Sequence, residues 1–106
     1  MNEERDFESH FAALREKFRE RLAVYSHQLT AERQAFAASP NNDIVQRLRS
    51  LAHTLHGTAG TFGHVDVSDA AADLEAAADE VLGGSAESAS VIAPLRRLIR
   101  EVELAL

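Results

Sequence analysis

Residues 44–63 read IVQRLRSLAHTLHGTAGTFG, and this stretch is the most informative about the fold. Its apolar residues recur three or four positions apart, or at twice that distance, which is the spacing of one face of an α-helix. At about 100° per residue, that face holds Ile44, Leu48, Leu51, Leu55 and Phe62. The periodicity predicts a helix over residues 44–62 with this face in the core, and Gly63 is expected to end it.

The opposite face of this predicted helix is centred on His53 and points to solvent. The residues within about 40° of His53 are Gln46, Arg49, Gly57 and Gly60. A glycine inside a helix costs roughly 1 kcal/mol relative to alanine, so two of them on one exposed face need a reason. We expect both, and Gly57 in particular, to leave room for another molecule beside His53. Gly60 could instead mark fraying near the helix end.

The segment before this helix is also helical in pattern. A helix over residues 4–38 is predicted by one apolar stripe, which holds Phe7, Phe11, Leu14, Phe18, Leu22, Tyr25, Leu29 and Phe36. The stripe lapses at Glu32 and Arg33, and Thr30 could cap a second piece, so continuity past Thr30 stays open. Residues 39–42 are expected to form a turn, and Asp43 is the candidate N-cap of the next helix.

Two further helices are expected, over residues 69–82 and 86–106. Asp66 or Ser68 could cap the earlier one, and Pro94 is tolerated only near the start of the later one. Their inward residues are expected to be Leu74, Val81 and Leu82, then Ile92, Leu95, Leu98, Ile99, Val102 and Leu106. Short connections between four helices predict an all-α fold, an antiparallel up-down-up-down four-helix bundle that forms a single domain over residues 1–106.

Composition excludes several classes of function. The chain has 106 residues, no cysteine and a net charge of −6, so disulfides are excluded and nucleic-acid binding is disfavoured. No apolar run is long enough to span a membrane, and no signal-like leader is evident, so a cytoplasmic location is expected. Residues 44–65 contain no Asp or Glu. An acidic protein with such a segment is expected to present a face there that tolerates an approaching anion.

The exposed imidazole of His53 is the candidate reactive group. A histidine is mostly uncharged and nucleophilic at neutral pH, and no serine or cysteine with an orienting acid shares its face, as a catalytic triad would require. An isolated nucleophilic imidazole suits phosphoryl transfer, in which positioning and charge neutralisation can be supplied by a partner.

The stretch 52–63, AHTLHGTAGTFG, resembles the motif of histidine-containing phosphotransfer domains, and residues 70–75, AAADLE, are similar to their third helix. The resemblance implies a phosphoryl group on Nε2 of His53, exchanged with the aspartate of a response-regulator receiver domain or supplied through a hybrid histidine kinase. It also implies a phosphocarrier without kinase activity of its own. No metal or cofactor is expected in the chain, because the receiver supplies the Mg²⁺.

One position departs from that motif. His56, about 60° from His53 around the helix, stands where the family usually has a lysine beside the phosphate. Because a histidine is mostly uncharged at neutral pH, Arg49 is our hypothesis for the missing positive charge, and His56 is expected to help only when protonated. Partner contacts are expected from Gln46, Gly57, Gly60 and His64.

Two alternatives stay open. His53 and His56 share a helical face and His64 could approach them, so a metal site is conceivable, although zinc sites usually take three or four protein ligands. The chain could also be a plain helical interaction module in which His53 is incidental. A self-contained kinase is excluded by the absence of a phosphate-binding glycine loop. A monomer is expected, because four helices can close one core. A dimer stays open as an alternative, because the long first helix carries extra aromatic residues near its start.

Overall fold

The computed structural model describes residues 2–106 and contains four α-helices and one short 3₁₀ helix within them. The α-helices are α1 (Asn2–Ala38), α2 (Asn42–Thr61), α3 (Val65–Leu82) and α4 (Ile92–Ala105), and the 3₁₀ helix η1 (Ser88–Val91) precedes α4. No strand occurs in the described part of the chain, which confirms the all-α class. None of these helices is both long and apolar enough to cross a membrane.

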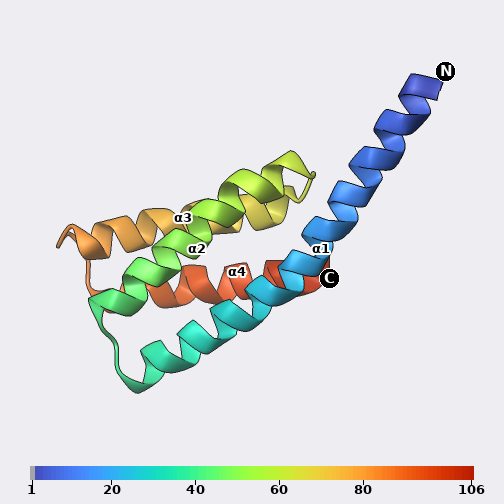
Figure 1. Cartoon of the computed structure of the whole chain (residues 1–106). Helices are drawn as coiled ribbons and strands as arrows, with labels where there is room; N and C mark the ends of the chain where they lie inside the picture. The colour runs from blue at the N-terminus through green and yellow to red at the C-terminus, as the bar shows by residue number, and fades with distance from the viewer. Residues whose placement is uncertain (1) are drawn as a thin grey trace.

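The core lies where the four helices meet. Figure 1 shows α2 and α3 side by side, with α4 against α3 and the C-terminal part of α1 alongside α4. The largest fully buried side chains are Leu22, Leu29, Leu48, Leu55, Leu74, Leu95, Leu98, Val45, Val67, Val91 and Val102. Both Leu48 and Leu55 belong to the face predicted to be inward, whereas Leu51 and Phe62 of that face are only partly buried.

Helix α1 is continuous through Thr30, which answers the question of a break at that position. Its length of about 55 Å exceeds that of the other helices, so its N-terminal part projects past them (Figure 1). The apolar stripe is buried only from Phe18 onward: Phe7 is 70% exposed and Leu14 is 39% exposed. The stripe therefore contributes to the core only in its C-terminal part, and Phe7 and Leu14 lie outside the core.

The ends of α2 use local backbone chemistry. The side chain of Asn41, and not that of the expected Asp43, accepts a hydrogen bond from the backbone N–H of Ile44 at 3.0 Å. At the other end Gly63 has a φ of +83°, and His64 N–H donates to the Ala59 carbonyl at 2.9 Å. This pattern is a Schellman C-cap, which requires the left-handed conformation that glycine adopts easily. Gly63 thus ends the helix as predicted.

The last two helices begin at other residues than expected. Helix α3 starts at Val65, four residues earlier than expected. The hydroxyl of Ser68, an expected cap, instead donates to the carbonyl of His56 in α2. Helix α4 starts at Ile92 after the 3₁₀ turn, which places Pro94 in its first turn, where no backbone N–H is needed. Ile92 and Leu106 were expected inside but are exposed.

Candidate functional site

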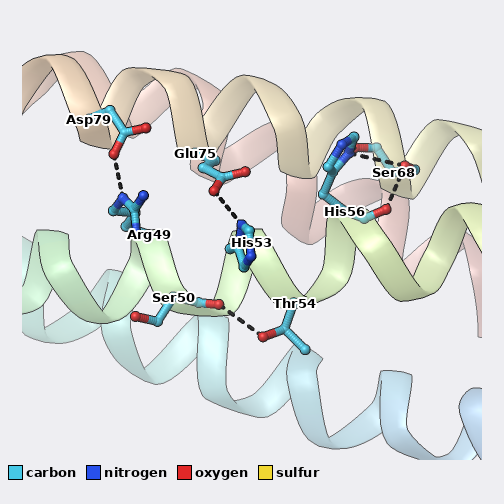
Figure 2. Close-up of polar contacts among 8 residues, drawn as sticks. All are labelled: Arg49, Ser50, His53, Thr54, His56, Ser68, Glu75 and Asp79. Atoms are coloured by element: carbon cyan, nitrogen blue, oxygen red, sulfur yellow. Dashed lines mark hydrogen bonds and ion pairs between the residues drawn. The ribbon is translucent and has the colours of Figure 1, made fainter.

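His53 lies at the middle of α2 on the face opposite the core, and its side chain is 69% exposed. Its Nδ1 is 2.6 Å from Oε2 of Glu75, which projects from α3 (Figure 2). A carboxylate can only accept a hydrogen bond, so Nδ1 must carry the proton and donate it to Glu75. In the neutral ring the lone pair is then on Nε2, which makes no polar contact within residues 2–106.

This hydrogen bond has two chemical consequences. It fixes the orientation of the ring. It also fixes the tautomer, because the hydrogen bond made by Nδ1 determines which ring nitrogen carries the proton in the neutral imidazole. It also places the negative charge of Glu75 beside the imidazole, where it stabilises the positive charge that the ring gains when Nε2 forms a bond to an electrophile. Glu75 is itself only 18% exposed, so its position is well defined.

Arg49, one turn before His53, is also engaged by α3. Its Nε donates to the carboxylate of Asp79, and this hydrogen bond together with the charge of Asp79 raises the pKa of the Arg49 guanidinium above its usual value. The guanidinium is therefore directed along α3 and not over the ring of His53 (Figure 2). Both partners remain accessible to solvent.

His56 is held by the first turn of α3. Its Nδ1 is 3.2 Å from the carbonyl oxygen of Ser68 and 3.3 Å from the Ser68 hydroxyl, which in turn donates to the carbonyl of His56 at 2.9 Å. Because a carbonyl only accepts, the geometry places the Nδ1 proton of His56 toward Ser68. Figure 2 shows the ring of His56 lying against α3, away from His53.

The two glycines of the stripe have different surroundings. A Cβ added to Gly57 would meet no atom within 4 Å, whereas one added to Gly60 would lie 3.3 Å from the hydroxyl oxygen of Ser68. Close packing of α3 thus accounts for the absence of a side chain at Gly60, where room for another molecule was expected. The expected open space is present at Gly57, one turn after His53.

The remaining predicted contact residues lie on either side of this region. Gln46 is exposed and lines a groove of about 640 Å³ between α1 and α2, together with Tyr25, Ser50 and Thr54. Across the same groove Arg47 Nε contacts both oxygens of Glu32 at 3.0 Å, and this bond raises the pKa of Arg47. The groove opens along the flank of α2 that α3 does not cover.

His64 is not brought to the face of His53. It lies at the turn between α2 and α3, where its ring packs against Phe18 with centroids 5.6 Å apart. The three histidines considered for a metal site thus have separate surroundings: His53 contacts Glu75 and His56 contacts Ser68. No group of three or more His, Cys, Asp or Glu side chains in the described residues is arranged to hold a metal ion.

Sequence reasoning missed Glu75 and Asp79, although a signal for both was present. Helix α3 runs back along α2, so residues equally far from His64 meet. The pairs are Arg49 with Asp79, His53 with Glu75, and Gly60 with Ser68, at fifteen, eleven and four residues from His64. Residues 44–65 contain no Asp or Glu, and the carboxylates that contact Arg49 and His53 belong to α3.

Comparison with known proteins identifies the family. Neither the curated proteins nor the solved structures gave a match. A model of the Hpt domain matches residues 11–105, which is nearly the whole chain and includes His53, Glu75 and all of α2 and α3. Because the match covers far more than half of the sequence, this chain belongs to the Hpt domain family.

Proposed function

We propose that this chain is a phosphocarrier of a two-component phosphorelay, which accepts a phosphoryl group on Nε2 of His53 from the aspartyl phosphate of a receiver domain and returns it to such an aspartate. Histidine phosphotransfer is the activity that the Hpt family suggests. The observation that carries the assignment of His53 is its hydrogen bond to Glu75, which leaves a proton-free Nε2 on an exposed face.

In the proposed step the lone pair of Nε2 forms a bond to phosphorus while the bond from phosphorus to the aspartate oxygen breaks. The aspartate leaves as a carboxylate, and the imidazole becomes a phosphoimidazolium that keeps its proton on Nδ1. Glu75 lies against that proton and stabilises the positive ring. The receiver supplies Mg²⁺, and the chain needs no cofactor and no kinase activity of its own.

The partner is proposed to approach over Gly57, where nothing fills the space beside His53. Gln46 and the groove between α1 and α2 lie on the same uncovered side of α2. As part of the same proposal, the four helices alternate in direction as an up-down-up-down bundle, and residues 1–106 form one domain. These features would present His53 on a rigid helix, which holds a reacting group more precisely than a loop does.

The test is phosphotransfer from a panel of receivers, each phosphorylated in advance with a small-molecule donor. We expect label on the wild-type chain that is lost in acid, a ³¹P signal of an N-linked phosphate, and no label on His53→Ala. His10→Ala is the matched control, because His10 is an exposed histidine of α1, a helix that does not contact α3 within residues 2–106, and the variant should leave labelling unchanged. Absence of His53-dependent label with every receiver would contradict the proposal and favour a plain interaction module.

A further inference from the structure

The N-terminal part of α1 projects past the other helices (Figure 1). It carries apolar side chains that are exposed to solvent. Phe7 and Leu14 are exposed, and Phe7 stacks on Phe11 with ring centroids 6.3 Å apart. Scattered exposed apolar residues are ordinary, but these share one helical stripe with Phe18, and contiguous apolar patches mark interaction sites. The stripe therefore indicates a surface that another molecule covers.

The spacing of the stripe favours pairing with an identical helix. Phe7, Phe11, Leu14 and Phe18 are four, three and four residues apart, which is the spacing of the buried seam of a two-helix coiled coil. The series is the same when read in reverse. Two antiparallel copies centred between residues 12 and 13 therefore bring Phe7 level with Phe18, and Phe11 level with Leu14, of the second copy. Phe18 is only 3% exposed and Phe11 is half-buried, because both rings pack on Phe62 of their own chain. The apolar side chains that this chain offers to a second copy are thus Phe7 and Leu14.

The charges of α1 select the antiparallel direction. Residues 3–8 are mostly acidic, and residues 15–21 are mostly basic. Antiparallel pairing places the acidic segment of each copy along the basic segment of the other, whereas parallel pairing would place like charges together. In the same register Glu4 comes level with Arg21, and Glu8 with Lys17, and all four lie within about 90° of the stripe around the helix.

A hollow of about 450 Å³ lies where Phe7 of a second copy would arrive. Leu14, Phe18 and Phe62 form its apolar walls, and its charged lining residues are Lys17, Arg21 and Glu20, which leave a net positive charge. Phe7 is flanked in the sequence by Asp6 and Glu8. An aromatic side chain with acidic neighbours thus has a complementary apolar hollow with a net positive lining on the same chain, too far along α1 for its own Phe7 to enter.

We propose that two copies of this chain associate through residues 4–21 of α1 in antiparallel orientation, each inserting Phe7 into the hollow of the other. The overlap of the helices is about 27 Å. Both His53 faces remain free, because His53 lines no part of the hollow. Phe7 and the acidic residues beside it precede the part matched by the family model, which begins at residue 11. This association replaces the monomer expected from the sequence.

The first test is sedimentation equilibrium of the whole chain over a wide concentration range. We expect the wild type to dimerise and Phe7→Glu to raise the dissociation constant by roughly tenfold or more, because a buried aromatic side chain becomes charged. Val24→Glu is the matched control, since Val24 is an exposed apolar residue of α1 outside the stripe. A wild type that is monomeric throughout, or equal dissociation constants for the two variants, would overturn the proposal.

Charge reversal tests the orientation. Glu4→Lys/Glu8→Lys and Lys17→Glu/Arg21→Glu should each be monomeric alone, because both ends of either homodimer would then carry like charges. An equimolar mixture of the two variants should restore a dimer, since both ends of the mixed pair are complementary. Failure of the mixture to associate, while each variant remains folded by circular dichroism, would rule out the antiparallel arrangement.

Discussion

The two edges of α2 that flank His53 differ in what covers them. The closed edge, formed by Arg49, His56 and Gly60, faces α3, and each of its residues has a close neighbour there. The open edge, formed by Gln46 and Gly57, faces solvent and the groove beside α1. The residues that the sequence places on one exposed stripe therefore form two surfaces in the fold. The closed edge packs against α3, and the open edge is accessible to another molecule.

His53 needs two things from its surroundings: an oriented ring and access for a partner to Nε2. Neighbours on α3 orient and polarise the ring from the closed side, where they are held by packing between helices. The open side leaves space through which a second molecule can reach Nε2. A residue that serves the closed edge should affect stability or ring chemistry, whereas a residue of the open edge should affect only encounters with a partner.

The largest effect is expected for Glu75→Gln. An amide can donate as well as accept, so it no longer requires the proton on Nδ1, and it has no charge to stabilise the phosphoimidazolium. We expect the transfer rate to fall roughly ten- to a hundredfold. The ¹⁵N shifts of the His53 ring should move toward a mixture of tautomers, which a merely structural loss would not cause.

Asp73→Asn is the matched control for that variant. It makes the same change of charge on the same helix, but Asp73 bonds to Arg97 of α4 at 2.6 Å and does not contact His53. Its transfer rate should equal that of the wild type. If Glu75→Gln and Asp73→Asn transferred phosphate equally fast, the closed edge would have no chemical role.

An intermediate effect on the transfer rate is expected for Gly57→Ala, on the open edge. Gly57→Ala should raise the free energy of unfolding by about 0.5–1 kcal/mol, because alanine is the better helix former and its Cβ meets nothing. The same methyl should slow transfer by about tenfold if a partner packs tightly there. Urea unfolding and receiver-dependent labelling measure the two quantities.

Gly60→Ala should give a different pattern. Its Cβ presses on the hydroxyl of Ser68, which is fixed by its bond to His56, so little or no stability is gained. Its transfer rate should stay near that of the wild type, because α3 and not a partner occupies this side. Equal slowing by the two alanine variants would show that the division into edges is not functional.

Local patterns in the sequence were enough to predict four helices and most of the core. Periodicity located α2 correctly, and the conformational freedom of glycine correctly ended it at Gly63. The predicted start of α3 was wrong, and Ser68, which has the chemistry of a helix cap, uses its hydroxyl between helices. Periodicity also cannot tell a buried apolar stripe from an exposed one, so it did not indicate where along α1 the stripe leaves the core.

For the candidate site, the sequence indicated which face of α2 matters but not what lies beside it. His53 and Gly57 were both placed correctly on an exposed face. The contacts of Glu75 and Asp79 depend on the register between α2 and α3, which the periodicity of one helix does not contain. That register follows only from the position of the turn at His64.

The smallest effects are expected for the two residues considered as partners of the phosphate. Arg49 must leave Asp79 to reach a phosphoryl group on His53, and this is feasible because ion pairs between accessible side chains are weak, whereas guanidinium–phosphate bonds are strong. We expect Arg49→Ala to slow transfer by roughly three- to tenfold at neutral pH. Asp79→Asn, which releases the guanidinium without removing it, should leave the rate unchanged or raise it slightly.

His56→Ala makes the comparison decisive, because His56 lies on the same edge but is bonded to Ser68. Its ring lies against α3, away from His53 (Figure 2), so its removal should leave the rate of transfer near that of the wild type. Measuring all three variants with one receiver at one pH distinguishes the hypotheses. A slower His56→Ala with an unaffected Arg49→Ala would assign the phosphate contact to the histidine that replaces the lysine of the family, and would leave Arg49 as a residue that only joins α2 to α3.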